Sequence, residues 1–449
     1  MQSTVPELIA GLCPDYAEVQ IYNEKEIDIP LDSHWDLVFF SYLHSFYEHT
    51  KILSAIFRKK GMKTVAGGRH ASCFFKDCLK YFDVVIIGEP ESNVPQLIRD
   101  FEKGKTKTIY SNPPIEPIHI RPSRYDLIDF AVNKMRVPGI EASRGCPFSC
   151  NFCVLTGHEQ YRCRPVRDVI KEIEFKMCFN KSYFGIGNNC FIFVDNNLGG
   201  SRLYLTALCE ALIPLKKRWG CSLSLDVLEN EALVKLMGKA GCRYIYSGLE
   251  SLDPESIKSM NKGQNKTSGL NKIIQRCFSN GILFSFGLII GSDGDTNEYL
   301  ERVPEYIADL KYSFVTFIGF VCPYPETPFF RQLRADGRIL RGAISRDYDG
   351  YTLCHLPKKL NPEEAVEHFI RLCTYLGSRK NLIKHYFTRL GNSSSLFYNA
   401  IILFSGVKFL DIKNIIKNNK RSYVAGNDTI EEWDENKLKE FGFPTQSIS

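Results

Sequence analysis

Residues 139–335 alternate short apolar segments with helical patterns, and this alternation constrains the fold more than any other feature of the sequence. Short apolar runs between turn residues are typical of buried strands. Strands that alternate with helices form parallel sheets, and six such units predict a partial (β/α)6 barrel. The expected strands are Gly139–Ser143, Cys190–Asp195, Ser222–Asp226, Tyr244–Gly248, Leu283–Ile290 and Phe314–Phe320. The expected helices are Val166–Cys178, Arg202–Trp219, Glu229–Ala240, Pro254–Met260, Ser268–Asn280 and Asn297–Leu310.

Polar and glycine residues gather where these strands end. Such barrels place their chemistry at the carboxyl ends of the strands, so we expect these residues to share one rim. Each of them alone is equally explained as a helix cap, a turn former or the partner of a lysine. Their common position favours a site. The residues are Asp195, Asn196, Asn197, Asp226, Gly248 to Ser251, Gly291 to Thr296, and Pro323 to Pro325.

Three cysteines, Cys146, Cys150 and Cys153, follow the first of these strands at C-x3-C-x2-C spacing. Thiolates this close together can converge on one metal centre. A closed zinc site takes four ligands, as does a four-iron cluster that only transfers electrons, so three cysteines leave one metal position open. Two alternatives remain: a group of ordinary buried thiols in a chain with 16 cysteines, and a zinc site completed by a residue such as His158.

The cysteine loop resembles the cluster loop of the radical S-adenosylmethionine (SAM) enzymes. In that family three such cysteines hold a [4Fe–4S] cluster, and an aromatic residue precedes the third. The stretch from Tyr161 to Pro165 resembles the Tyr-Arg-x-Arg segment that follows the loop, and Gly291 to Thr296 resembles a Gly-x-Pro-Gly-Glu-Thr loop with two aspartates in place of Pro and Glu. The resemblance implies that the three cysteines are the metal ligands. It implies SAM contacts at Phe152, Asp195, Gly248, Glu250 and Gly291.

Residues 1–110 also alternate strand and helix patterns, which predicts a Rossmann-like, doubly wound α/β sheet. The expected strands are Glu18–Tyr22, Asp36–Ser41, Lys63–Ala66 and Asp83–Ile87. The expected helices are Pro6–Cys13, Tyr47–Lys60, Ser72–Tyr81 and Glu91–Lys103. Two strands run into glycine-bearing loops, where backbone approaches a flat cofactor or simply turns into a helix.

The order of these pieces resembles the cobalamin (B12)-binding domain that precedes the barrel in one subgroup of the family. Because the chain begins near the first helix, we expect this domain to lack its first strand. The Asp-x-His-x-x-Gly motif, whose histidine ligates cobalt in the classical methyltransferases, is absent. The resemblance implies cobalamin contacts at Gly67, Gly68, His70, Gly88 and Glu89.

The remaining segments complete the predicted domain order of 1–110, 111–138, 139–335 and 336–449. Five prolines in 111–138 predict an extended linker. The C-terminal region is helical in pattern, with helices expected at Pro362–Tyr375 and Leu396–Ile416, and we expect it to set substrate choice. The aromatic and acidic loop from Asp347 to Tyr351 fits either a lid over the barrel mouth or a connector.

Charge and hydropathy exclude some classes of protein. A net charge of +6 over 449 residues is too weak to indicate a nucleic-acid partner. The longest apolar candidate, Phe397–Phe409, is shorter than the roughly 18–20 residues that span a bilayer, so no transmembrane segment is expected. The first 13 residues lack the pattern of a secretory signal. Sixteen cysteines therefore indicate metal use in a reducing cytoplasm rather than disulfides.

The family resemblance implies an enzyme that cleaves SAM reductively to a 5′-deoxyadenosyl radical, with a donor such as flavodoxin or ferredoxin and a small-molecule substrate. With cobalamin in the N-terminal domain, it implies methylation of an unactivated carbon, for example in a natural product. One alternative is a cobalamin-independent oxidation, rearrangement or cyclisation. Another is a non-catalytic metal-binding module whose cysteines only staple a loop.

Overall fold

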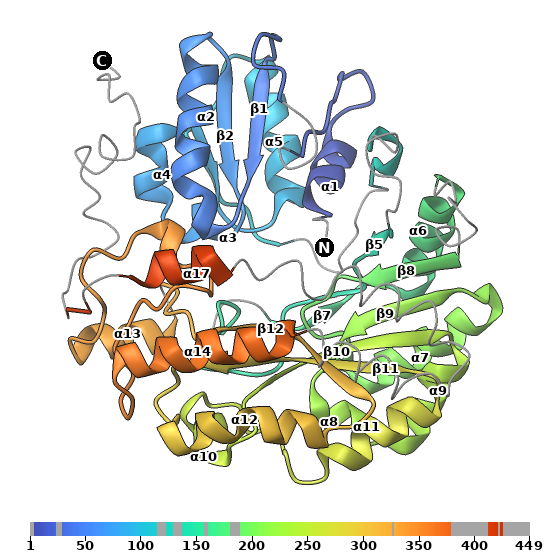
Figure 1. Cartoon of the computed structure of the whole chain (residues 1–449). Helices are drawn as coiled ribbons and strands as arrows, with labels where there is room; N and C mark the ends of the chain where they lie inside the picture. The colour runs from blue at the N-terminus through green and yellow to red at the C-terminus, as the bar shows by residue number, and fades with distance from the viewer. Residues whose placement is uncertain are drawn as a thin grey trace. The chain divides into compact units, whose positions relative to one another are not determined.

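The computed structural model describes residues 4–23, 29–114, 123–128, 137–156, 160–179, 189–325, 327–378, 412–420 and 423–424. The chain folds into two compact units (Figure 1). The small unit lies within residues 5–133 and 339–349, and the large unit within residues 134–338 and 350–424. Most of the expected linker lies outside the described residues, and the four-domain division stays a prediction.

The small unit is built on a parallel four-stranded sheet whose strands lie in chain order. The strands are β1 (Leu37–Ser41), β2 (Lys63–Gly67), β3 (Val84–Ile86) and β4 (Ile109–Tyr110). The helices are α1 (Val5–Leu12), α2 (Tyr47–Lys59), α3 (Arg69–Cys73), α4 (Phe75–Tyr81) and α5 (Pro90–Glu102). Because successive side chains of a strand face opposite ways, Val84 and Ile86 join one core while Val85 joins the other. Helices α1 and α5 cover one face, and α2 to α4 cover the other (Figure 1).

One expected strand of this unit is wrong: Glu18–Tyr22 joins no sheet. The Gln20 amide donates to the Glu18 carboxylate at 3.2 Å, and both side chains are exposed. Val19 and Ile21 alone supply little apolar surface to hold the segment against a neighbouring strand. The other expected strands and helices are confirmed near their expected bounds, with one helix divided into α3 and α4.

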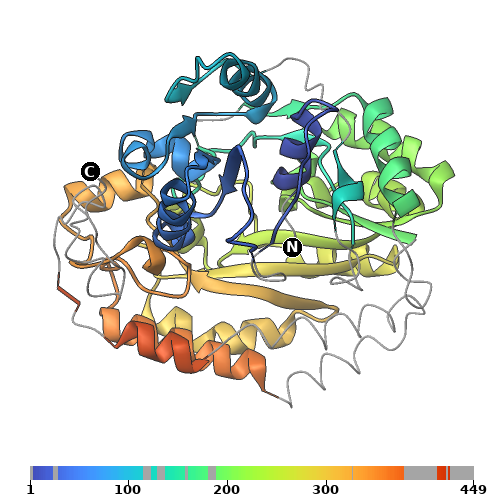
Figure 2. The ribbon, with the colours of Figure 1, turned by 90° about the horizontal axis from the view of Figure 1, so that it is seen from above.

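The large unit contains a parallel six-stranded sheet in the order β12-β11-β10-β9-β8-β5. The strands are β5 (Gly139–Ile140), β8 (Cys190–Phe193), β9 (Arg218–Ser222), β10 (Cys242–Glu250), β11 (Leu283–Ile290) and β12 (Ser313–Phe320). Seen from above, the long strands run side by side (Figure 2). This is the expected partial barrel, and because all six strands are parallel their carboxyl ends lie along one edge.

Helices follow most of these strands, and most of these helices form one core with the sheet. They are α6 (Val166–Phe179), α7 (Arg202–Leu212), α8 (Leu225–Leu228), α9 (Glu231–Lys239), α10 (Pro254–Ser259), α11 (Leu270–Ser279), α12 (Asn297–Asp309), α13 (Pro328–Ala335), α14 (Pro362–Gly377) and α17 (Ile412–Asn419). A short antiparallel hairpin joins β6 (Ser143–Arg144) to β7 (Arg162–Cys163). No helix among the described residues is long and apolar enough to cross a membrane.

The third expected barrel strand, Ser222–Asp226, is misplaced. The strand is β9, four residues earlier, and Asp226 instead belongs to the short helix α8. Gly220 of β9 packs beneath Tyr244 of the adjacent strand, where a Cβ atom would lie 3.1 Å from the tyrosine ring. The apolar residues of α8 are buried in the same core, and a short buried helix of this kind cannot be told from a strand by hydropathy alone.

Two C-terminal predictions have different outcomes. Helix α14 confirms Pro362–Tyr375, whereas most of Leu396–Ile416, including Phe397–Phe409, lies outside the described residues. The loop from Asp347 to Tyr351 is divided between the units: Tyr348 belongs to the small unit, and Gly350 belongs to the large unit, where its carbonyl accepts the Phe320 N–H at 2.7 Å. The loop therefore joins the two units along the chain, and its alternative role as a lid stays a prediction.

Candidate functional site

The cysteine loop follows β5 and β6 at the carboxyl edge of the large sheet. Gly145 begins it with a φ of +80°, a conformation that glycine adopts without steric cost. The thiols of Cys146, Cys150 and Cys153 form no disulfide. Burial raises the pKa of Cys150 and of Cys153, and the neighbouring thiols add to both shifts, so the trio lies within electrostatic range. Among the described residues, however, no three His, Cys, Asp or Glu side chains already form a metal ligand set.

Residues 259–265, which run from the last residue of α10 toward α11, hold the cysteine loop, and we call this segment the clasp. The Asn151 backbone N–H donates to the Met260 carbonyl at 3.1 Å. The Asn261 amide donates to the Ser149 carbonyl at 2.7 Å. The loop is thus fixed to the connection that follows β10, by bonds on both sides of its second cysteine.

Two amide side chains direct N–H groups at the cysteine sulfurs. The Gln264 amide, from the clasp, donates to the Sγ atom of Cys150 at 3.3 Å. The Asn197 amide, which follows β8, lies 3.9 Å from the Sγ atom of Cys146. Such N–H to sulfur bonds are the outer-shell contacts that accompany metal-bound thiolates. Three free cysteines on one tight loop, with donors at two of the sulfurs, fit a cluster-binding role.

Glu250, at the end of β10, forms a buried ion pair with Lys262 of the clasp. Its Oε1 atom lies 2.7 Å from the Lys262 Nζ atom, and the side chains are only 9% and 12% exposed. Burial opposes the ammonium charge, but the carboxylate and nearby thiols raise the pKa of Lys262. A Cβ at Gly248 would collide with the Glu250 carboxylate, so glycine there makes room for the pair. The Lys262 ammonium also lies 5.7 Å from the centroid of the Phe152 ring.

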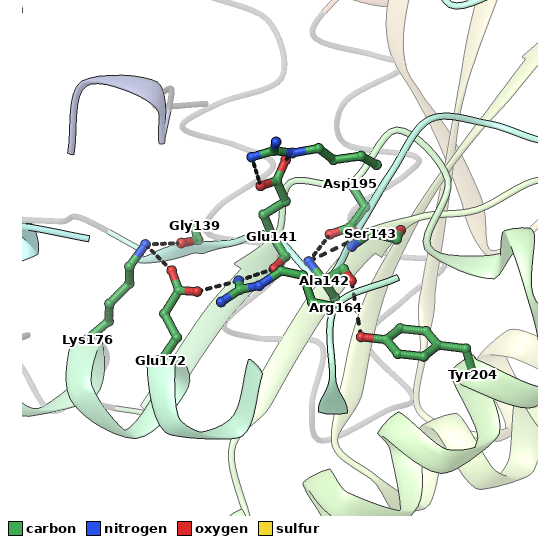
Figure 3. Close-up of polar contacts among 10 residues, drawn as sticks. Gly139, Glu141, Ala142, Ser143, Arg164, Glu172, Lys176, Asp195 and Tyr204 are labelled. Carbon is green, nitrogen blue, oxygen red and sulfur yellow. Dashed lines mark hydrogen bonds and ion pairs between the residues drawn. The ribbon is translucent and has the colours of Figure 1, made fainter. Parts of the chain in front are cut away.

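Asp195, just beyond β8, turns toward the strand that leads into the cysteine loop (Figure 3). Its carboxylate accepts the Ala142 N–H at 3.1 Å, the Ser143 hydroxyl at 2.6 Å and the Ser143 N–H. The Tyr204 hydroxyl donates to the Ala142 carbonyl at 3.1 Å. Burial raises the pKa of Asp195 to about 7, although its hydrogen bonds act in the opposite direction. Asp195 therefore fixes the backbone that leads to Cys146.

A charged network of Arg164 with two residues of α6, which we call the α6 network, fixes the same stretch from its other side (Figure 3). Arg164 forms an ion pair with Glu172 and donates to the Glu141 carbonyl. Lys176 lies 2.9 Å from Glu172 and donates to the Gly139 carbonyl at 2.8 Å. Although burial works against ionisation, the two cations hold the pKa of Glu172 below its usual range. Backbone carbonyls before the cysteine loop are thus tied to one buried network in which two cations share the Glu172 carboxylate.

The loop after β11 closes around Asp295. Its carboxylate accepts the Gly291 N–H at 2.8 Å and the Ser256 hydroxyl at 2.6 Å. The imidazole of His355 bonds the Gly291 carbonyl at 2.8 Å. Gly291 has a φ of +89°, so glycine suits this tight turn. Both backbone polar groups of Gly291 are therefore engaged within the protein.

In the small unit, the glycine loops lie side by side at the ends of β2 and β3. The Ser72 hydroxyl links them, because it donates to the Gly68 carbonyl at 2.9 Å and accepts the Gly88 N–H at 3.0 Å. A Cβ at Gly88 would meet nothing within 4 Å, and one at Gly67 or Gly68 would make a single ordinary contact, at 3.8 Å to Ile86 or 4.0 Å to Ser41. Glu89 caps α5, and its carbonyl accepts the Asn93 amide at 2.7 Å. These glycines leave open space beside the backbone.

His70 does not share this open space. Its Nδ1 atom lies 2.6 Å from Nδ1 of His44, and both imidazoles are buried. The rings of Tyr47 and Phe74 surround His70, with centroids 4.2 and 4.9 Å away. The Tyr348 ring stands edge-on to His44 at 5.4 Å. Burial lowers the pKa of His70 to about 2 and that of His44 to about 4, so both are neutral.

The structure thus gathers part of the predicted site. Phe152, Gly248 and Glu250 lie with the cysteine loop at the clasp, whereas Asp195 and Gly291 are engaged with backbone and neighbouring side chains. Their roles as SAM contacts stay predictions, as do those of the three cysteines as ligands. His158, the alternative zinc ligand, lies outside the described residues. Neither the clasp nor the α6 network was predicted from the sequence. For the clasp, the one visible signal was a run of three amides and a lysine in residues 261–265.

Comparisons with known proteins agree with this arrangement. The Radical SAM superfamily model matches residues 140–307. The bacteriochlorophyllide d C-12(1)-methyltransferase of Chlorobaculum tepidum is 27% identical over 379 residues, which cover 81% of this chain and 80% of that protein. The hopanoid C-2 methylase of Rhodopseudomonas palustris is 26% identical and covers 74% of this chain and 64% of its own length.

Two solved structures share the fold. The radical SAM methyltransferase TsrM of Kitasatospora setae, with tryptophan and a SAM analogue bound, superposes with a TM-score of 0.57 at 17% identity, covering 76% of this chain and 79% of that chain. The cobalamin-dependent enzyme OxsB, with aqua-cobalamin and SAM bound, gives a TM-score of 0.59 at 13% identity, covering 86% and 70%. Radical SAM enzymes use a [4Fe–4S] cluster and SAM. Residues 140–307 are therefore a radical SAM domain, which makes the chain an enzyme, and the chain shares its fold with TsrM and OxsB.

Proposed function

We propose that this enzyme methylates an unactivated carbon of a small molecule, with a [4Fe–4S] cluster, SAM and cobalamin as its cofactors. The cysteine loop carries the proposal: three free thiols are anchored by the clasp at the carboxyl edge of the large sheet, with amide donors at two sulfurs. The names of two relatives, a bacteriochlorophyllide methyltransferase and a hopanoid methylase, support methyl transfer to carbon.

Cys146, Cys150 and Cys153 would hold the cluster, and the open glycine loops of the small unit would receive cobalamin. When bound, these groups supply a 5′-deoxyadenosyl radical from SAM and a methyl group carried on cobalt. The chain's own residues position them. Asp195 and the α6 network fix the backbone before the cysteine loop, and the clasp fixes the loop itself.

A second candidate is radical chemistry without cobalamin. One observation favours it: His70, the histidine of the Gly-Gly-x-His loop, is buried against His44 and two aromatic rings. It therefore offers no imidazole to cobalt from this position. A relative named as an anaerobic magnesium-protoporphyrin IX monomethyl ester cyclase, from Cereibacter sphaeroides, is 27% identical over 339 residues.

Iron and cobalt contents of the same preparation test the two candidates. The protein is reconstituted without oxygen with iron, sulfide and hydroxocobalamin, then freed of unbound metal. We expect about four irons and one cobalt per chain, and SAM cleavage when dithionite or reduced flavodoxin is added. Four irons without cobalt would favour the cobalamin-free reaction. A preparation without iron would contradict both candidates.

A further inference from the structure

Gln264 of the clasp lies between two residues, Lys262 and Asn265, whose side chains are anchored to the end of β10. The Asn265 amide donates to the carbonyls of Gly248 and Leu249 at 2.7 and 2.9 Å. On the other side, Lys262 is paired with Glu250. Because both neighbours are fixed to the end of β10, the Gln264 side chain is presented to the cysteine loop from rigid backbone.

The Gln264 amide N–H points at a cysteine sulfur rather than at a carbonyl. Its Nε2 atom lies 3.3 Å from Sγ of Cys150, a residue that is only 7% exposed. Sulfur is a weak acceptor as a thiol and a much stronger one as a thiolate, because hydrogen bonds to ionised groups are shorter and stronger. The geometry therefore suits a thiolate at position 150 better than a thiol.

The Lys262 ammonium, a charge close to the contact between Gln264 and Cys150, is already neutralised by the Glu250 carboxylate. Lys262 would favour negative charge on the cysteines, but the Glu250 carboxylate lies 2.7 Å from its ammonium. The pair as a whole adds little net charge at the loop. The Gln264 amide is then the directional donor from the clasp to the sulfur of Cys150.

We propose that Gln264 is a positioning residue that raises the reduction potential of the cluster through its hydrogen bond to Cys150. This inference rests on the proposed cluster role of the three cysteines. Reduction adds negative charge, part of which resides on the cysteine sulfurs, and an N–H donor stabilises the reduced form more than the oxidised form. Hydrogen bonds to sulfur are among the levers that set the potentials of iron–sulfur clusters.

Gln264→Leu removes the donor while keeping similar volume, and Gln264→His keeps an N–H donor. Gln275→Leu, on the exposed face of α11, is the matched control. The readouts are iron per chain and the potential of the cluster from an anaerobic titration followed by electron paramagnetic resonance. With full iron, we expect Gln264→Leu to lower the ratio of reduced to oxidised cluster about tenfold at fixed potential, or about 59 mV for one electron. Gln264→His and Gln275→Leu should stay near the wild type.

Three outcomes would overturn the proposal. If Gln264→Leu holds its iron and titrates as the wild type does, the hydrogen bond sets no potential. If Gln264→Leu and Gln264→His both lose iron, position 264 serves packing alone, whereas loss only in the leucine variant supports the donor. If the wild type takes up no iron, the proposed function fails together with this proposal. The first two outcomes, in contrast, overturn only the role of Gln264.

Discussion

The carboxyl edges of the two sheets bury ionisable groups in different ways. In the large unit, the buried groups at this edge include acids: Asp195 accepts backbone N–H groups after β8, Asp295 does the same after β11, and Glu250 is paired with Lys262. In the small unit, the buried titratable pair is basic but neutral, because His44 and His70 bond each other among aromatic rings.

The two units therefore fix the carboxyl edges of their sheets in two different ways. Hydrogen bonds between buried acids and backbone N–H groups fix the position of a loop, which suits the role proposed for the three cysteines. Neutral imidazoles among aromatic rings form a packed base instead, and the glycine loops above it keep their open space. The two units should therefore respond differently to substitution and to pH.

The largest effect is expected at the cysteine loop. Cys150→Ala should abolish iron retention and SAM cleavage, because two remaining thiolates cannot replace a three-cysteine ligand set. The far-ultraviolet circular dichroism should be unchanged, since the loop is also held by Asn151 and Asn261. Cys178→Ala, at an exposed cysteine on α6, is the control and should bind iron normally. If Cys150→Ala instead fails to fold, the cysteines would act as a structural staple.

The next largest effect is expected at the buried ion pair. Lys262→Met leaves the Glu250 carboxylate buried without its cation, which should cost roughly 3–5 kcal/mol of unfolding free energy. Urea unfolding of the cofactor-free protein measures this. The double variant Glu250→Gln/Lys262→Met should recover most of the loss, because neither charge is then stranded. Arg202→Met, at a more exposed pair with Asp226, should cost less than about 1 kcal/mol. Equal losses in both variants would show that the clasp pair is effectively solvated.

The large sheet was predictable where hydropathy was unambiguous. Leu283–Ile290 is mostly apolar, and its bounds as β11 are those expected from the sequence. The third strand was misplaced because β9 contains an arginine and a glycine, whereas the neighbouring buried helix α8 is more apolar. Strand periodicity does not separate a four-residue helix from a strand of that length.

The candidate site was predictable at its cysteines and less so around them. The spacing of Cys146, Cys150 and Cys153 is local, so the sequence displays it directly. The clasp is joined to them only by folding, more than 100 positions along the chain. Its residues have no hydrophobic period to mark them. Likewise, nothing in the sequence placed His44 beside His70, because that contact joins the ends of two strands.

The histidine pair predicts acid sensitivity of the small unit. The pKa values of His44 and His70 are lowered to about 4 and about 2 in the folded protein, so the unfolded chain binds more protons below about pH 6.5. Stability is therefore full above that pH and falls as the pH drops toward 4. Hydrogen exchange of peptides from β2 and β3 measures this loss. His70→Phe should flatten the dependence, whereas His34→Phe, at an exposed histidine, should not. A dependence that persists in His70→Phe would count against the pair.

Asp195 predicts a smaller dependence of opposite sign in the large unit. Its pKa is raised to about 7, above the ordinary 3.8, so the folded protein binds more protons between these values. Its contribution is full below about pH 4 and is lost as the pH rises through 7. The raised pKa already includes the bonds from Ala142 and Ser143, which favour the carboxylate, so the loss reflects the excess of burial over those bonds. Exchange of β8 and β9 peptides should show it, Asp195→Asn should remove it, and Asp309→Asn, at an exposed position on α12, should retain it. A large unit that gains stability from pH 4 to 7 would mean that those hydrogen bonds outweigh burial, and that Asp195 fixes the cysteine loop as a charged group.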